Sequence, residues 1–260
     1  MRALILLMLT PALGSAVEID RAAAPAEGEA ESHVAAAVRE GQFLPTTLPA
    51  AIGHRQVTGL FLGGWDGGPL QGGSFSSQLE VALFHRVAVR VGVGYLNPVG
   101  RVEPSVGARV GILTQAQNRL DLSIGAFYNN VGFTEASGEF EFSVAASHRW
   151  NRVSLIGDVL YGQGLTPGER DGEVRLAALV LVHKRVNVGV DARARFDLGA
   201  DTPGRVRDKL ESDVDVLGGP LAMVTFGHFA ALAQLGLHSV ARNERFSTGA
   251  AAFAGLGATY

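Results

Sequence analysis

The sequence predicts an all-β fold, an antiparallel up-and-down β-barrel of about twelve strands. Three observations carry this prediction. Apolar and polar residues alternate with a period of two in many segments, short turn-forming stretches separate these segments, and the connections alternate between long and short along the chain. A period of two places the apolar side chains of a strand on one face and the polar ones on the other. The clearest case is residues 174–198, where two alternating segments flank a turn at residues 183–185.

Residues 1–16 have the features of a secretory signal peptide. Arg2 precedes an apolar run over residues 3–9, and the small residues Gly14, Ser15 and Ala16 predict cleavage near Ala16. The 260-residue chain has a net charge of −3 and no Cys. A chain without Cys has no disulfide framework, no thiol metal site and no lipid-modified Cys as an anchor. The slightly negative charge also excludes nucleic acid as an expected partner.

Residues 17–55 form a separate segment that is rich in Ala, Glu and Pro. Its acids are Glu18, Asp20, Glu27, Glu29, Glu31 and Glu40, against Arg21 and Arg39. Residues 29–40 could form a short helix that ends at Gly41. Two interpretations are open for this irregular or helical segment: a flexible tail on the periplasmic side, or a plug that enters a lumen carrying arginine side chains.

Residues 56–260 are expected to form the barrel. The predicted strands are centred on residues 57–65, 75–83, 87–95, 106–112, 120–128, 139–146, 153–161, 174–182, 186–198, 214–226, 229–240 and 246–260. The last three are less regular, because apolar residues occupy both faces around residues 221–229 and 250–253. The even strand count agrees with a closed antiparallel barrel.

The connections between these strands differ in length in a regular way. The long ones are residues 66–74, 96–105, 129–138, 162–172, 199–213 and 241–245, and the short ones are residues 84–86, 113–119, 147–152, 183–185 and 227–228. Alternate connections of an up-and-down barrel lie at the same end. One end therefore carries the short turns and both termini, as in barrels with short periplasmic turns and long extracellular loops.

Aromatic residues mark the expected membrane interfaces. Tyr95, Tyr128 and Tyr161 each end a strand that rises to the long-loop end, and the last strand ends at Tyr260. With these features, residues 56–260 resemble the class of Gram-negative outer-membrane β-barrels. The resemblance implies location in the cell outer membrane, contact with its lipid, and recognition by the barrel assembly machinery through the strand that ends at Tyr260. One departure is that Phe253 falls on the opposite face from Tyr260.

The apolar faces are expected to contact lipid and the charged faces to line the lumen. The turn at residues 183–185 places Glu173 opposite Arg195 and Arg175 opposite Arg193. The candidate lumen-lining selectivity residues are Glu173, Arg175, Asp191, Arg193, Arg195 and Asp197. They could form a mutually neutralised wall, or a basic ladder that selects anions. Further charged lumen positions are expected at Glu80, Arg90, Asp121, Glu139, Glu141, Arg152 and Asp158.

The sequence provides no catalytic, cofactor-binding or metal-binding residues. No His has a Ser two positions away, the spacing that lipid-cleaving barrels use on one strand face. No His-x-x-x-His motif is present. We therefore expect a narrow channel or transporter for small solutes. A closed structural or surface-interaction barrel is the first alternative, and a lipid-modifying outer-membrane enzyme is the second.

Overall fold

The computed structural model describes residues 47, 50–53, 55–68, 71–84, 86–96, 101–130, 138–165, 170–199, 213–242 and 245–260. The predicted signal peptide and the possible helix at residues 29–40 lie outside the described residues. The strands are β1 (Val57–Asp66), β2 (Gly72–Phe84), β3 (Val87–Leu96), β4 (Arg101–Leu113), β5 (Asp121–Asn129), β6 (Glu139–Trp150), β7 (Val153–Gly164), β8 (Arg170–His183), β9 (Val186–Asp197), β10 (Val214–Phe226), β11 (Phe229–Arg242) and β12 (Arg245–Thr259).

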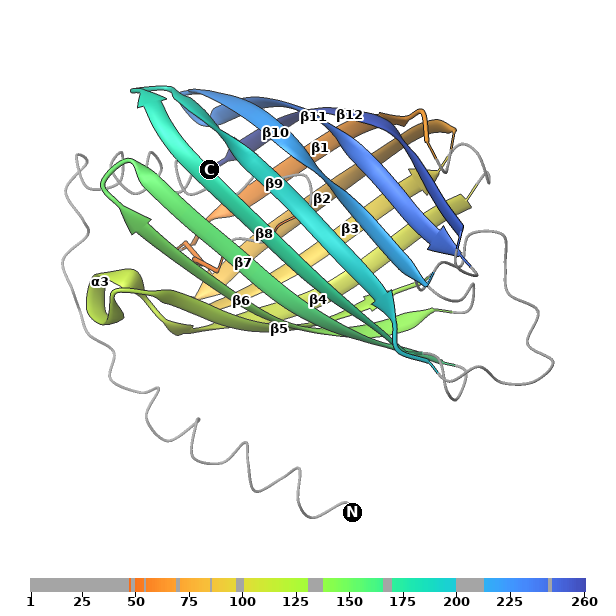
Figure 1. Ribbon diagram of the computed structural model, residues 1–260. Helices are drawn as coiled ribbons and strands as arrows, with labels where there is room; N and C mark the ends of the chain where they lie inside the picture. The colour runs from red at the N-terminus through yellow and green to blue at the C-terminus, as the bar shows by residue number, and fades with distance from the viewer. Residues whose placement is uncertain are drawn as a thin grey trace, which may run out of the picture. The chain divides into compact units, whose positions relative to one another are not determined.

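These strands form one closed antiparallel barrel, in which each strand pairs with its neighbours in the chain (Figure 1). The first and last strands close it. The backbone N–H of Val57 donates to the carbonyl of Tyr260 at 2.8 Å, and the N–H of Tyr260 donates to the carbonyl of Val57 at 2.9 Å. Closure leaves no unpaired sheet edge, which is what a strand structure in hydrocarbon requires. The predicted fold class and the number of strands are confirmed.

We call the end that holds the β2–β3 turn and the start of β1 the short-turn end, and the opposite end the long-loop end. The β4–β5 connection at the short-turn end contains the helical turn α3 (Gln115–Asn118), at the left in Figure 1. Gln115 binds the main chain of Arg149 on β6 through both atoms of its side-chain amide, at 2.7 and 3.0 Å. At the long-loop end, only residues 243–244 join β11 to β12, so the predicted contrast in loop length is wrong at this connection.

Two strands begin at least four residues earlier than the sequence predicts. β4 begins at Arg101 rather than near residue 106, and β8 begins at Arg170 rather than at residue 174. β4 includes Pro104, whose Cα partner is Val93 on β3. Proline cannot donate a ladder hydrogen bond, so it is uncommon inside a strand. Here its ring is exposed on the outer surface of the barrel.

The two faces of the barrel wall have the predicted polarity. Outward-facing apolar side chains are well exposed, for example Phe61 at 51%, Leu176 at 61% and Leu235 at 66%. Inward-facing charged side chains are buried, with Glu173 at 3% exposure and Asp191 at 0%. An apolar exterior around a charged interior is the arrangement for a barrel surrounded by lipid.

Aromatic side chains gather on the outer surface near both ends. At the long-loop end, Phe75 stacks on Tyr95 with ring centroids 5.3 Å apart, and Tyr128 lies 5.1 Å from Phe140. At the short-turn end, exposed aromatic residues are Phe84, Trp150, Phe226, Phe229 and Tyr260. Two aromatic belts separated by an aliphatic band are typical of membrane-spanning barrels.

Part of the interior is apolar. The buried cluster consists of Leu60, Leu62, Ile156, Ala177, Leu179, Leu221, Met223, Ala230 and Leu232, from β1, β7, β8, β10 and β11. These residues explain why the later strands have apolar residues on both faces: the outward set faces lipid and the inward set packs together inside the barrel.

Within the described residues, no helix is long and apolar enough to cross a membrane.

Leu176 lies near the middle of β8 and points outward, so it tests the lipid-facing assignment. We expect Leu176→Arg to lower the free energy of unfolding by about 2–4 kcal/mol, the cost of an arginine at the bilayer midplane. The measurement is urea unfolding of the barrel in lipid vesicles, followed by tryptophan fluorescence. The control is Val182→Arg at the strand end, where the expected loss is about 0–1 kcal/mol. Equal losses at both positions would contradict the assignment.

Candidate functional site in the lumen

The β8–β9 hairpin places charged residues on the inner wall in the predicted register. Glu173 pairs with Arg195, Arg175 with Arg193, and Ala177 with Asp191. The turn itself differs from the prediction. It is formed by Lys184 and Arg185, and an irregularity between Leu181 and His183 restores the register further up the hairpin. A bulge of this kind inserts one residue into one strand, so the predicted pairs survive a turn of different length.

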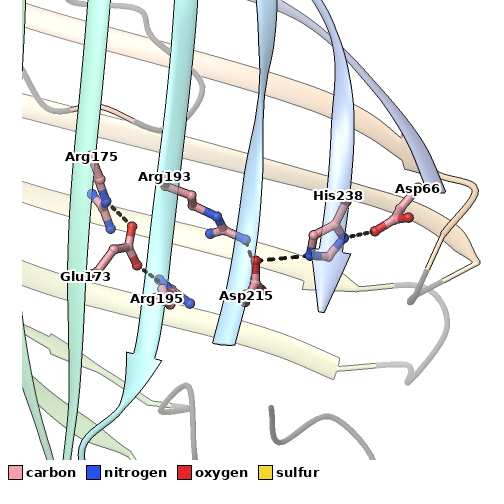
Figure 2. A network of polar contacts seen from close by, with 7 residues as sticks. All are labelled: Asp66, Glu173, Arg175, Arg193, Arg195, Asp215 and His238. Carbon is pink, nitrogen blue, oxygen red and sulfur yellow. Dashed lines mark hydrogen bonds and ion pairs between the residues drawn. The ribbon is translucent and has the colours of Figure 1, made fainter. Parts of the chain in front are cut away.

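Glu173 binds two arginines. One carboxylate oxygen accepts a hydrogen bond from Nε of Arg175 and the other from Nε of Arg195 (Figure 2). Arg175 also lies 3.5 Å from a carboxylate oxygen of Asp158 on β7. Glu173 is almost completely buried, so these bonds neutralise a carboxylate that has little access to water.

A second chain of contacts continues the polar network across β9, β10, β11 and β1 (Figure 2). Arg193 lies 3.6 Å from one carboxylate oxygen of Asp215, and the other oxygen of Asp215 contacts Nε2 of His238 at 3.1 Å. Nδ1 of His238 contacts the carboxylate of Asp66 at the end of β1. His238 therefore bridges two acids that come from opposite ends of the barrel sequence.

Arg175 and Arg193 are Cα partners, and like charges in this position repel. Each is turned towards acids on a different side: Arg175 towards Glu173 and Asp158, and Arg193 towards Asp215. A separation of 3.6 Å is an ion pair but too long for a hydrogen bond. Nε of Arg193 is buried without a hydrogen-bond partner among the described residues. Of the arginines drawn in Figure 2, Arg193 thus retains the most capacity to bind a further group.

The remaining two predicted residues, Asp191 and Asp197, lie on the lumen face and contact groups outside this network. Asp191 accepts a hydrogen bond from Oγ1 of Thr47, and its backbone carbonyl accepts one from Nε2 of Gln234 at 2.8 Å. Asp197 accepts a hydrogen bond from the backbone N–H of Gly199 at 2.8 Å, at the start of the β9–β10 loop. The hairpin residues therefore divide between the wall network, the barrel interior and the rim.

A second ionic cluster lies on the opposite part of the wall, over β2, β3 and β4. Nε and a terminal nitrogen of Arg90 donate to one oxygen of Glu80 at 3.1 and 2.8 Å. Nε of Arg109 donates to the same oxygen at 2.9 Å, and another nitrogen of Arg109 binds the second oxygen. The guanidinium of Arg90 also lies 5.8 Å from the ring centroid of Phe127, in cation–π range.

Three residues of the network were not predicted from the sequence, and one residue that was predicted to line the lumen lies elsewhere. Asp66, Asp215 and His238 were not predicted, although His238 follows Gln234 at period-two spacing on β11. Arg152 was expected in the lumen, but it is an exposed residue of the β6–β7 turn. Arg152 continues the period-two pattern of Asp158 on β7, but β7 begins only at Val153.

Among the described residues, no group of three or more His, Cys, Asp or Glu side chains could hold a metal ion. No protein-family model matches the chain, and no curated protein matches it. Solved structures do match. The NanC porin shares 9% sequence identity at a TM-score of 0.55, covering 77% of this chain and 98% of the porin. The fold is that of the outer-membrane β-barrels.

The KdgM porin matches to the same extent, with 6% identity and a TM-score of 0.54 over 78% of this chain and 99% of the porin. A second structure of KdgM, in complex with disordered oligogalacturonate, matches at 7% identity and the same TM-score over the same shares of both chains. Identities this low concern the fold alone. The shared architecture nearly spans each porin from end to end.

Proposed function

We propose that this protein is a narrow outer-membrane channel for small solutes and that its lumen favours cations over anions. The observation that supports this proposal most strongly is the charged inner wall of a closed barrel with an apolar exterior. Charged side chains on the inner wall favour a lumen that contains water and ions, whereas an entirely apolar interior would be packed with side chains. The tight pairing of the wall charges supports a narrow bore rather than a wide one.

The balance of charge on the described inner wall supports cation preference. The inward-facing acids are Asp66, Glu80, Glu103, Asp121, Glu139, Glu141, Asp158, Asp171, Glu173, Asp191, Asp197 and Asp215. The inward-facing arginines are Arg90, Arg109, Arg149, Arg175, Arg193 and Arg195. Acids outnumber arginines, so the wall attracts cations and repels anions. The basic ladder of β8 and β9 is neutralised by Glu173 on β8 itself and by Asp158 and Asp215 on the neighbouring strands, which argues against selection of anions.

Planar-bilayer recording of the refolded protein tests this proposal. Two forms are compared, one that begins at the expected mature residue Val17 and one that also lacks residues 17–53. We expect discrete conductance steps from at least one form, and a reversal potential in a KCl gradient that indicates preference for K⁺. Silence from both forms, with the barrel shown to be folded by circular dichroism, would overturn the channel. Steps that favour Cl⁻ would overturn the cation preference.

A further inference from the structure

Thr47 and residues 50–53, which precede β1, lie inside the barrel. Thr47 and Ala50 are each only 2% exposed. Oγ1 of Thr47 donates a hydrogen bond to the carboxylate of Asp191, an inward-facing residue of β9. The backbone carbonyl of Ala51 accepts a hydrogen bond from the guanidinium of Arg109 at 3.2 Å. We call Thr47 and residues 50–53 the luminal segment.

The contacts show the direction in which the luminal segment runs. Ile52, which is closer to β1 than Thr47 is, places its Cδ1 3.8 Å from the position that a Cβ on Gly111 would take. Gly111 lies close to the short-turn end of β4, whereas Asp191 lies near the middle of β9. Traced back from Val57, the chain therefore enters the lumen through the short-turn end and reaches about half its height.

Both walls of the lumen contribute anchors to this segment. Arg109 belongs to the Glu80 cluster of β2–β4, and Asp191 belongs to the β8–β9 hairpin on the other part of the wall. Thr47 and Ala51, which are bound to opposite walls, occupy space through which a solute would pass. The anchors shown are single hydrogen bonds to one hydroxyl and one carbonyl, which can be exchanged for bonds to water at small net cost.

We propose that the luminal segment is a built-in plug, which closes the conducting path when it is seated and opens it when it withdraws through the short-turn end. This inference rests on the proposed channel function. It assigns a gating role to residues that precede the barrel, and it predicts that the position of the segment, rather than a movement of the wall, controls conductance.

Engineered disulfides test the plug, because the chain contains no Cys of its own. The full mature chain carries Ile52→Cys with Gly111→Cys, or Thr47→Cys with Asp191→Cys. A Cβ at Gly111 meets only ordinary contacts, the nearest at 3.8 Å, so the first pair is compatible with the fold. The matched controls pair Ile52→Cys with Val110→Cys and Thr47→Cys with Val190→Cys. Val110 and Val190 neighbour the target positions in sequence but face outward, with 39% and 52% exposure.

We expect each lumen-facing pair to form a disulfide under mild oxidation, and the outward-facing controls to form none. Conductance should fall at least tenfold in the oxidised protein and return on reduction. Absence of both disulfides, from variants whose single cysteines react with a thiol reagent, would overturn the placement of the segment. Disulfides without a change in conductance would overturn the gating role.

Failure of the proposed channel function gives a different result. If neither the reduced variants nor the form lacking residues 17–53 conducts, the channel and its gate are both refuted. Disulfide formation is measured by gel mobility and needs no conductance, so in that case it still decides whether the luminal segment is seated inside the barrel.

Discussion

Glu80→Leu is expected to lower the free energy of unfolding by about 3–5 kcal/mol, because it removes the acid shared by two buried arginines. The side chains of Arg90 and Arg109 are only 14% and 4% exposed. Without Glu80, both guanidinium groups lose the carboxylate that accepts their hydrogen bonds. Leucine fills a similar volume, so the loss reflects unpaired charge rather than a cavity. Urea unfolding in lipid vesicles measures the effect.

A triple variant supplies the control for this prediction. Replacing Glu80 by Leu together with Arg90→Leu and Arg109→Met removes the whole ionic cluster. Exchanging a complete buried ion cluster for apolar residues is often neutral or stabilising, so most of the lost stability should return. A loss below about 1 kcal/mol for Glu80→Leu alone would contradict the buried cluster, since that result would mean that water reaches both arginines.

Glu173→Gln is expected to shift the ion preference of the channel towards anions. The substitution removes one negative charge from the wall and leaves Arg175 and Arg195 less neutralised. One unit charge acts on an ion about 10 Å away in water with about 0.4 kcal/mol. This energy changes the occupancy of cations and anions about twofold each, in opposite directions, so the K⁺/Cl⁻ permeability ratio should fall about fourfold. The reversal potential in a KCl gradient measures it.

Two matched variants show whether the shift in ion preference comes from the charge on the lumen wall. Arg193→Gln removes a positive charge from the same level of the wall and should move the ratio in the opposite direction. Val174→Gln, next to Glu173 but facing outward, should leave the ratio unchanged. If Glu173→Gln and Val174→Gln gave the same ratio, the network would not line the conducting path.

The sequence predicted the β8–β9 hairpin down to its residue pairs because its alternation is unbroken and its turn is short. A compact turn leaves few registers, and burial of one face excludes those that differ by one residue. The irregularity at Val182 was not predictable from the pattern, since Val182 and Val186 both fit the apolar face. It left the predicted pairs intact because it compensates for a turn of two residues.

The Arg193–Asp215 and Asp66–His238 contacts could not be predicted in the same way. β9 and β10 are separated by residues 198–213, and a connection of that length leaves the register between them open. Asp66 meets His238 only because β1 and β12 close the barrel, which is a contact between opposite ends of the chain. The early start of β4 was not predicted for a local reason: this part of the strand contains Pro104, which faces outward.

Closure between β1 and β12 also determines when the barrel can form. The paired amides of Val57 and Tyr260 belong to the first and last parts of the barrel, so they cannot meet until the last strand of the barrel has been synthesised. Pairing of such distant residues has a high contact order and is slow. Until that moment β1 and β11 each present an open edge, which hydrocarbon does not tolerate and which other chains can extend. Insertion into the membrane must therefore accompany closure, and a chain that stopped before β12 would be directed to aggregation rather than to a smaller barrel.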